Sequence, residues 1–281
     1  MKLSICSYSF HRTLLAGKQD IFKYIDDCKS LGATHLEPWI AHFGTTRGFI
    51  YEEDPENKWS VLRLMMEQAL PADPGYLGKI VRATQEAGLV MNGIAVDGAH
   101  IYDPDETVRE ANRQRAYQWL DVAQKIGAAQ MRVDSGGDTD MTDDVFKIIV
   151  KGYEDLVERG KAKGIQILIE NHWGASQNPQ NVVKILDTVE GLGLLFDTCN
   201  WLEGKQELGW QLCAKYASAT HIKTFEFDEY GNAPSVDLPR VLNMLRDTGY
   251  DGVWGIESVP RYVSEYEGVK RTIDLIHRVL G

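Results

Sequence analysis

The sequence predicts a single (β/α)8 barrel, the TIM barrel fold, which spans residues 1–281. Short apolar runs of β type alternate with amphipathic helical stretches from one end of the chain to the other. Several predicted helices are followed by a glycine that leads straight into the next apolar run, and no linker or change of composition divides the chain. Alternating strands and helices are typical of parallel α/β folds, and eight such units without a break favour a barrel.

Eight apolar runs have the length and composition of buried strands. They cover residues 3–8, 34–38, 90–96, 130–133, 165–170, 193–197, 221–224 and 252–257. Between and after them, apolar residues recur with the period of a helix that buries one face. The helices predicted in this way cover residues 21–30, 76–87, 108–126, 144–163, 179–189, 210–217, 238–247 and 265–280.

Glycines mark the junctions at which predicted helices give way to strands. Gly32, Gly88, Gly127 and Gly164 each stand at such a junction. Glycine tolerates the left-handed conformation that closes a helix, so these positions suit the αβ loops of a barrel. A doubly wound sheet is the alternative. Its dinucleotide-binding form needs a glycine-rich turn after the first strand, where this chain has SYSFH at 7–11.

One connection, at residues 40–75, is too long for a simple βα loop. It contains two aromatic clusters, an acidic patch and a predicted extra helix over 58–70. Long βα loops lie at the catalytic face of a barrel and often act as lids. An oligomer contact is an equal alternative, so assembly into a homo-oligomer is compatible with the sequence.

Composition and charge restrict the classes of partner and location. The formal net charge is −11 and no basic block is visible, so nucleic acid is disfavoured as a partner. No apolar run reaches the roughly 18 residues of a membrane span, and residues 1–8 lack the features of a secretory signal. We therefore expect a cytoplasmic protein without a membrane partner. Its four cysteines form no CxxC pair, and we expect them to be reduced.

The residues best suited to chemistry stand where apolar strands end, and in a barrel these side chains face the active site. Glu170, Asp197 and Glu257 end predicted strands five, six and eight, and His221 begins strand seven. A carboxylate buried without a partner costs several kcal/mol, and three neighbouring carboxylates cannot compensate one another. A divalent metal ion can compensate them all.

These four side chains would offer three oxygen ligands and one nitrogen ligand. Such a set suits Mn²⁺, Mg²⁺ or Co²⁺, tolerates Zn²⁺, and leaves two positions at which a substrate can chelate. We expect one divalent ion per chain, with Mn²⁺ as the first choice. A single strand-end aspartate is more often a helix cap, but four such residues around one rim favour a metal site.

The same strand ends resemble a known family. The segments are GIQILIENH at 164–172, LGLLFDTCNW at 192–201, ATHIKTFEF at 219–227 and GVWGIES at 252–258. Together they resemble the xylose isomerase-like barrel superfamily of sugar isomerases and epimerases, which includes ketose 3-epimerases, hydroxypyruvate isomerase and inosose dehydratase. The resemblance covers essentially the whole chain.

The resemblance implies that Glu170, Asp197, His221 and Glu257 bind one divalent metal ion, and that Lys223 lies at the substrate. Two positions depart from the pattern of the 3-epimerases. Asn200 stands where these enzymes commonly have a substrate-contacting histidine, and Thr224 replaces the usual acidic residue. Both differences disfavour a strict ketose 3-epimerase, and neither affects the metal ligands.

Further residues near the strand ends are candidates for substrate binding. His172 is predicted to contact substrate or shuttle a proton, with an orienting role toward Glu170 as the alternative. Arg132 and Glu37 are predicted to bind hydroxyl groups. By strand alternation Asp134 faces the same side as Arg132, so hydroxyl binding by both or a buried structural ion pair between them are the two alternatives. Trp173 could offer an apolar face to a sugar. The complete set of substrate-binding candidates is Glu37, Arg132, His172, Trp173, Asn200 and Lys223.

The predicted reaction is an isomerisation or epimerisation of a sugar or polyol-derived ketone through an enediolate. Glu170 and Glu257 are the catalytic candidates, because each can bind the metal through one oxygen and exchange a proton through the other. The same enediolate allows elimination, so a lyase or dehydratase acting on a keto-sugar or inosose is the related alternative. A metal-free sugar-binding protein is the alternative of another class. A nuclease of the endonuclease IV type would need more histidine ligands and a basic groove.

Overall fold

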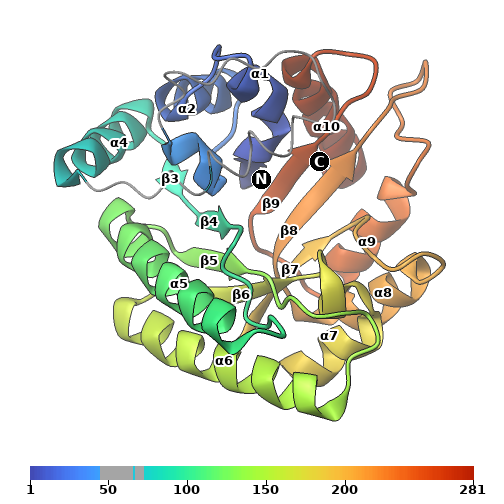
Figure 1. Cartoon of the computed structure of the whole chain (residues 1–281). Coiled ribbons are helices and arrows are strands. Elements are labelled where there is room, and N and C mark those ends of the chain that lie inside the picture. The colour runs from blue at the N-terminus through green and yellow to red at the C-terminus, as the bar shows by residue number, and fades with distance from the viewer. Residues whose placement is uncertain (45–65, 67–72) are drawn as a thin grey trace.

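The strands of the chain lie side by side in a parallel sheet that curls into a barrel, with helices around it (Figure 1). The computed structural model describes residues 1–44, 66 and 73–281. The strand order in the sheet is β3-β2-β1-β9-β8-β7-β6-β5-β4. The strands are β1 (Leu3–Cys6), β2 (His35–Glu37), β3 (Val90–Met91), β4 (Gly93–Val96), β5 (Gln130–Val133), β6 (Gln166–Glu170), β7 (Gly193–Asp197), β8 (Ala217–Thr224) and β9 (Trp254–Ser258).

The two ends of this sheet meet at Asn92, the residue between β3 and β4. β3 pairs with β2, whereas β4 pairs with β5. The Asn92 N–H donates to the carbonyl oxygen of Leu36 at 2.9 Å, and the Asn92 carbonyl accepts from the Gln130 N–H at 3.0 Å. The predicted third strand is therefore present in two pieces that close the ring, and the prediction of a TIM barrel is confirmed.

Helices surround the barrel in the order that the sequence predicts. They are α1 (His11–Leu15), α2 (Ile21–Ser30), α4 (Pro74–Ala87), α5 (Glu106–Ile126), α6 (Asp143–Lys163), α7 (Pro179–Leu186), α8 (Gln206–Cys213), α9 (Leu238–Asp247) and α10 (Glu265–Leu280). Short 3-10 helices add η1 (Ser7–Phe10), η2 (Ile40–Phe43), η3 (Gly174–Gln177) and η4 (Ala214–Tyr216). Helices α4, α5 and α6 end at left-handed Gly88, Gly127 and Gly164, as expected. Within the described part of the chain, no helix has the length and apolar character needed to cross a bilayer.

Several element boundaries differ from the prediction by a few residues. The first strand ends at Cys6 rather than at residue 8, because Ser7 begins η1 and its Oγ accepts a hydrogen bond from the Trp39 N–H at 2.8 Å. The strand predicted at 221–224 begins earlier, at Ala217, where small residues hide the apolar pattern. The helix predicted at 210–217 lies at Gln206–Cys213. Most of the predicted 40–75 insertion, including the helix at 58–70, lies outside the described residues.

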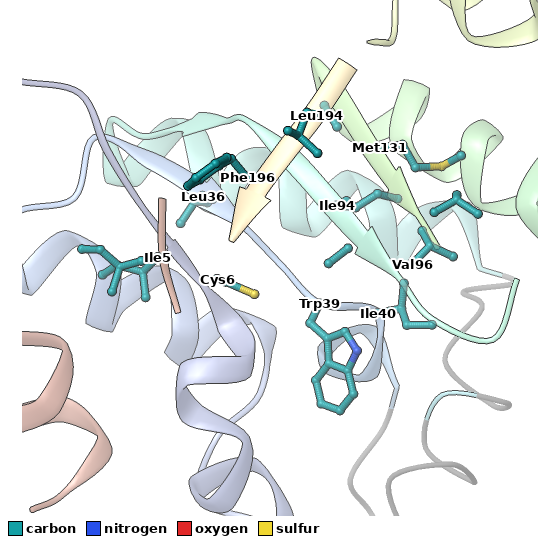
Figure 2. Packing of buried hydrophobic residues seen from close by; sticks show 14 of the residues in the cluster. Ile5, Cys6, Leu36, Trp39, Ile40, Ile94, Val96, Met131, Leu194 and Phe196 are labelled. Carbon is teal, nitrogen blue, oxygen red and sulfur yellow. The ribbon is translucent and has the colours of Figure 1, made fainter. Parts of the chain in front are cut away.

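Alternate residues of each strand pack into two different layers, one outside the barrel and one inside it. Successive side chains of a strand point to opposite faces, so Leu194 and Phe196 of β7 face one side while Leu195 faces the other. Figure 2 shows Leu194 and Phe196 among the apolar residues of the large core. Leu195 packs in a separate, small cluster with Leu168 and Ala219. The second set lies inside the barrel, on the same strand face as Glu170, Asp197 and His221.

A close contact between two βα loops depends on a glycine. Gly174 opens η3 with a φ of +64°, and a Cβ at this position would lie 2.1 Å from the carbonyl oxygen of Gly137. The next residue, Ala175, donates its N–H to the Gly136 carbonyl oxygen at 3.0 Å. Gly174 therefore holds the loop after β6 against the loop after β5.

Gly174→Ala should destabilise the fold more than Gly204→Ala. Gly204 has a φ of +73°, but a Cβ there would meet nothing within 4 Å, so its substitution costs only the backbone strain, about 1 kcal/mol. Gly174→Ala adds the clash with Gly137, about 1–3 kcal/mol more. Urea unfolding of both variants measures the difference. Equal losses of stability would show that the two loops separate at no cost.

Candidate metal centre

The four predicted metal ligands come together inside one end of the barrel. Glu170 and Asp197 are the last residues of β6 and β7, His221 lies within β8, and Glu257 lies within β9. One ligand atom from each residue lies within 4.8 Å of the others, and all four side chains are buried. Asp197 pairs with His221 across β7 and β8, so the parallel register itself places neighbouring ligands at the same height.

The imidazole of His221 is oriented by carboxylates on both sides. Its Nδ1 lies 3.1 Å from Glu170 Oε1 and 3.2 Å from Glu257 Oε2, while its Nε2 lies 2.7 Å from Glu37 Oε1. An Nε2–H that donates to Glu37 leaves Nδ1 free to bind a cation. Gly255 permits this arrangement, because a Cβ there would lie 2.1 Å from the Thr220 carbonyl oxygen and 3.1 Å from Glu37 Oε2.

Asp197 is held so that one of its oxygens stays available. Its Oδ1 accepts the N–H groups of Cys199 at 2.6 Å and Asn200 at 3.0 Å. The Asn171 side chain bonds both the N–H and the carbonyl oxygen of Asp197, at 2.8 and 2.9 Å. The other oxygen, Oδ2, is buried and forms no hydrogen bond, but it lies 3.1 Å from the ammonium group of Lys223. The buried Glu170 Oε2 likewise has only an ion-pair partner, Arg132 Nε at 2.9 Å. Buried carboxylate oxygens that are neutralised only by side-chain cations can exchange those contacts for a metal ion.

Burial and charge act in opposite directions on these groups. Burial opposes ionisation of Glu257, but Lys223 and His221 outweigh it and hold its pKa well below the usual range. Burial is also the main reason why the pKa of Asp197 is raised. For His221, burial disfavours the proton, yet Glu37 and Glu170 raise its pKa well above the usual value.

The cluster therefore attracts positive charge strongly. A divalent ion bound at Nδ1 of His221 would replace the proton that the neighbouring carboxylates otherwise favour. The donor set of three carboxylates and one imidazole thus fits a divalent cation, on the evidence of the buried Asp197 Oδ2 and Glu170 Oε2.

Arg132, a predicted substrate contact, lies in a network of buried carboxylates. Its Nε lies 2.9 Å from Glu170 Oε2, and its Nη1 lies 2.5 Å from Asp97 Oδ1 and 3.1 Å from Asp134 Oδ2. His172 joins the network through Nδ1, 3.3 Å from Asp134 Oδ2. Asp97, Asp134 and His172 also have the spacing of a metal site, but the Arg132 guanidinium already supplies the positive charge there. The buried ion pair is thus present, and a contact of Arg132 with substrate stays a prediction.

The other substrate-binding candidates surround the same cluster. Lys223 Nζ donates to Asn200 Oδ1 at 2.9 Å and lies within ion-pair distance of Asp197 and Glu257. Trp173 is 51% exposed and packs edge-on against His172, with ring centroids 5.0 Å apart. Glu37 contacts His221 rather than open space. Their roles toward a substrate stay predictions.

Sequence reasoning missed one neighbour of the site, Tyr8, whereas it had identified Asp134 as a partner for Arg132. Tyr8, in η1, stacks on His11 at 4.4 Å, and burial together with the charge of Glu257 raises the pKa of its phenol. Asp134 is fully buried, pairs with Arg132 and His172, and has its pKa lowered against burial by these two cations. Tyr8 lies two residues beyond the end of β1, close to the strand ends where the ligands lie, so the same signal could have identified it.

A hollow of about 370 Å³ lies elsewhere, on the outer face between α5 and α6. Residues of both charge signs line it, among them Arg109, Glu110 and Lys151. None of the clustered carboxylates reaches it. We place the candidate site at the strand ends, because buried ionisable groups that meet in one cluster are typical of catalytic and metal sites, and the described residues that line the surface hollow form no such cluster.

Comparison with known proteins agrees with this architecture. A family model described as a xylose isomerase-like TIM barrel matches residues 25–278. The chain belongs to this family. The resemblance found at the strand ends is thereby confirmed. No curated protein sequence matches the chain significantly.

Solved structures of this family share the fold across nearly the full chain. D-psicose 3-epimerase from Clostridium cellulolyticum H10 is 14% identical, with a TM-score of 0.69 over 100% of this chain and 99% of that one. The "probable 3-DHS dehydratase" AsbF from Bacillus anthracis is also 14% identical, with a TM-score of 0.69 and 99% coverage of both chains. A xylose isomerase-like TIM barrel protein from Mycobacterium smegmatis, solved with magnesium, is 14% identical, with a TM-score of 0.68 over 100% of this chain and 98% of that one. Such low identities establish the fold alone.

Asp197→Ala and His221→Ala should abolish metal binding while the barrel stays folded. Each substitution removes a ligand, and losing Asp197 also relieves carboxylate repulsion in the metal-free protein. Elemental analysis after reconstitution with Mn²⁺ should find about one ion per wild-type chain and almost none in either variant. Asp144→Ala, which changes a carboxylate 90% exposed to solvent, is the matched control and should keep its metal.

A chelator gives an independent check. It should lower the melting temperature of the wild-type protein, because an ion that binds only the folded state stabilises that state. If wild-type protein reconstituted with Mn²⁺ or with Zn²⁺ contains no metal, the assignment of these four residues as metal ligands is wrong.

Proposed function

We propose that the protein is a divalent-metal-dependent isomerase or epimerase that acts on a sugar or a polyol-derived ketone through an enediolate. One observation carries this proposal. Three buried carboxylates and one imidazole, from four consecutive strands, present their ligand atoms within 4.8 Å of one another at the active-site end of a TIM barrel. Membership of a family whose solved structures include a sugar epimerase supports it.

The proposed chemistry begins with acidification of a carbon–hydrogen bond. A bound divalent ion would polarise the substrate carbonyl and stabilise negative charge as the neighbouring carbon loses its proton. Glu257 is the first candidate for taking that proton, because its contacts to His221 and Lys223 both use Oε2 and leave Oε1 to act as a base. Glu170 contacts His221 through Oε1 and Arg132 through Oε2, so its second oxygen is less free.

Neighbouring residues would orient the substrate and balance its charge. The ammonium group of Lys223, held beside Asn200, would stabilise an anionic oxygen that develops during deprotonation. His172, paired with Asp134, would donate or accept a second proton on the other side. The exposed ring of Trp173 would cover the apolar face of a sugar ring.

The same residues could support elimination, so a lyase or dehydratase acting on a keto-sugar or inosose is the second candidate. The observation that favours it is the equal likeness in fold to the dehydratase AsbF. If no metal binds, a metal-free sugar-binding protein becomes the better interpretation. In each case we propose a small-molecule ligand, a cytoplasmic location and no nucleic-acid partner, in keeping with the net charge of −11.

Glu257→Gln should lose at least ~10²-fold in turnover while it retains measurable metal, because glutamine keeps one coordinating oxygen but accepts no proton. Turnover is measured with Mn²⁺ against a panel of ketoses, inososes and 3-keto sugars. The control is Glu267→Gln, the same change on the outer face of α10, where Glu267 pairs with Arg271. Near-wild-type turnover in Glu257→Gln would remove Glu257 from the acid–base role.

Turnover in D₂O should place deuterium on the carbon next to the substrate carbonyl. A proton carried by a carboxyl group exchanges with water, whereas a hydride shifted between neighbouring carbons does not. The hydride route normally uses two close metals, and in the neighbouring group of Asp97, Asp134 and His172 both aspartates already pair with Arg132. NMR of product and recovered substrate measures the label. Complete retention of the original hydrogen, together with two metals per chain, would contradict the enediolate route.

A further inference from the structure

We propose that Lys223 is a built-in counter-ion that competes with the divalent metal for two of its ligands and is released when the metal binds. The proposal rests on the metal site of the proposed function and adds a step to its assembly. Lys223 Nζ lies 3.1 Å from Asp197 Oδ2 and 3.0 Å from Glu257 Oε2. Its ammonium group thus lies between two of the four predicted metal ligands.

Lys223 and a metal ion would compete because both would use the same carboxylate oxygens of Asp197 and Glu257. Asp197 Oδ1 is already used by the N–H groups of Cys199 and Asn200, so Oδ2 is the oxygen that a metal would take. Lys223 contacts this same atom. Glu257 likewise uses one oxygen, Oε2, for both His221 Nδ1 and Lys223 Nζ. A metal bound at His221 Nδ1 and Asp197 Oδ2 would therefore occupy the position that the ammonium group now occupies.

Electrostatic repulsion prevents the metal ion and the Lys223 ammonium group from contacting the same oxygens at the same time. A side chain that is only 9% exposed needs partners for its charge, and in the metal-free protein the two carboxylates provide them. A dication bound to the same oxygens would repel an ammonium group a few ångströms away, in surroundings that screen charge poorly. The side chain has a third partner, Asn200 Oδ1 at 2.9 Å, which takes no part in the predicted metal site. Lys223 can therefore turn toward Asn200 without losing every contact.

Two consequences follow. Lys223 partly neutralises the carboxylates without a metal, which would favour folding of the barrel before the ion binds. Metal binding then frees the ammonium group to face the substrate, which couples the arrival of the metal to the completion of the substrate site. Because such coupling is reciprocal, any change that removes the ammonium group must strengthen metal binding.

The first test measures Mn²⁺ affinity of the metal-free protein by calorimetric titration, without substrate. Lys223→Met keeps the length of the side chain and removes its charge, and it should bind Mn²⁺ at least tenfold more tightly than wild type. Lys223→Arg keeps the charge and should stay within a few-fold of wild type. Lys147→Met is the surface control, because the Lys147 side chain is 73% exposed. Affinity in Lys223→Met that is equal to or weaker than wild type would overturn the proposal.

The second test needs no variant and so is independent of folding defects. Amine labelling of wild-type protein, read by mass spectrometry, should modify Lys223 several-fold faster with Mn²⁺ than without, while Lys147 stays unchanged. Slower or unchanged labelling of Lys223 would overturn the release step. If wild-type protein binds no divalent ion in the titration, the proposed metal-dependent function fails as well. Binding at about one ion per chain with no effect of Lys223→Met rejects this inference alone.

Discussion

Four carboxylates, Glu37, Glu170, Asp197 and Glu257, are buried together inside one end of a closed barrel, and the surrounding groups are arranged around their charge. The barrel forces this convergence, because the carboxyl ends of all its parallel strands meet in one ring. Such a cluster is stable only with positive charge nearby. His221 lies between Glu37, Glu170 and Glu257. Lys223 contacts Asp197 and Glu257, and Arg132 contacts Glu170, so each of these cations balances part of the buried negative charge.

Strand alternation separates this charged interior from the apolar core. On β7, Leu194 and Phe196 pack with the large core, whereas Leu195 and Asp197 face the inside of the barrel. The thin apolar layer of Leu168, Leu195 and Ala219 lies one step below the charged ring. Substitutions in the ring can therefore change chemistry without removing much of the apolar packing that stabilises the fold. This separation of the apolar core from the charged ring explains why TIM barrels support many reactions on one scaffold.

The chemistry that the ring can perform depends on which atoms are free. Hydrogen bonds already engage Asp197 Oδ1 and His221 Nε2, so Asp197 Oδ2 and His221 Nδ1 are the atoms that face the centre. This places the donor atoms before any ion arrives, and preorganised ligands lose little freedom on binding. The family model and the solved structures agree on the barrel fold, which a sugar epimerase and a probable dehydratase share.

The sequence by itself determined the barrel and the four residues that meet in it. Strand and helix periods are local, and a polar residue that ends an apolar strand is visible without any knowledge of its neighbours. Only the tertiary structure decided which of the charged side chains contact one another. Glu37 contacts His221 across 184 positions of sequence, and the contacts of Arg132 come from three separate strand ends. No local pattern encodes such contacts, because they depend on side-chain direction and on the register of strands far apart in the chain.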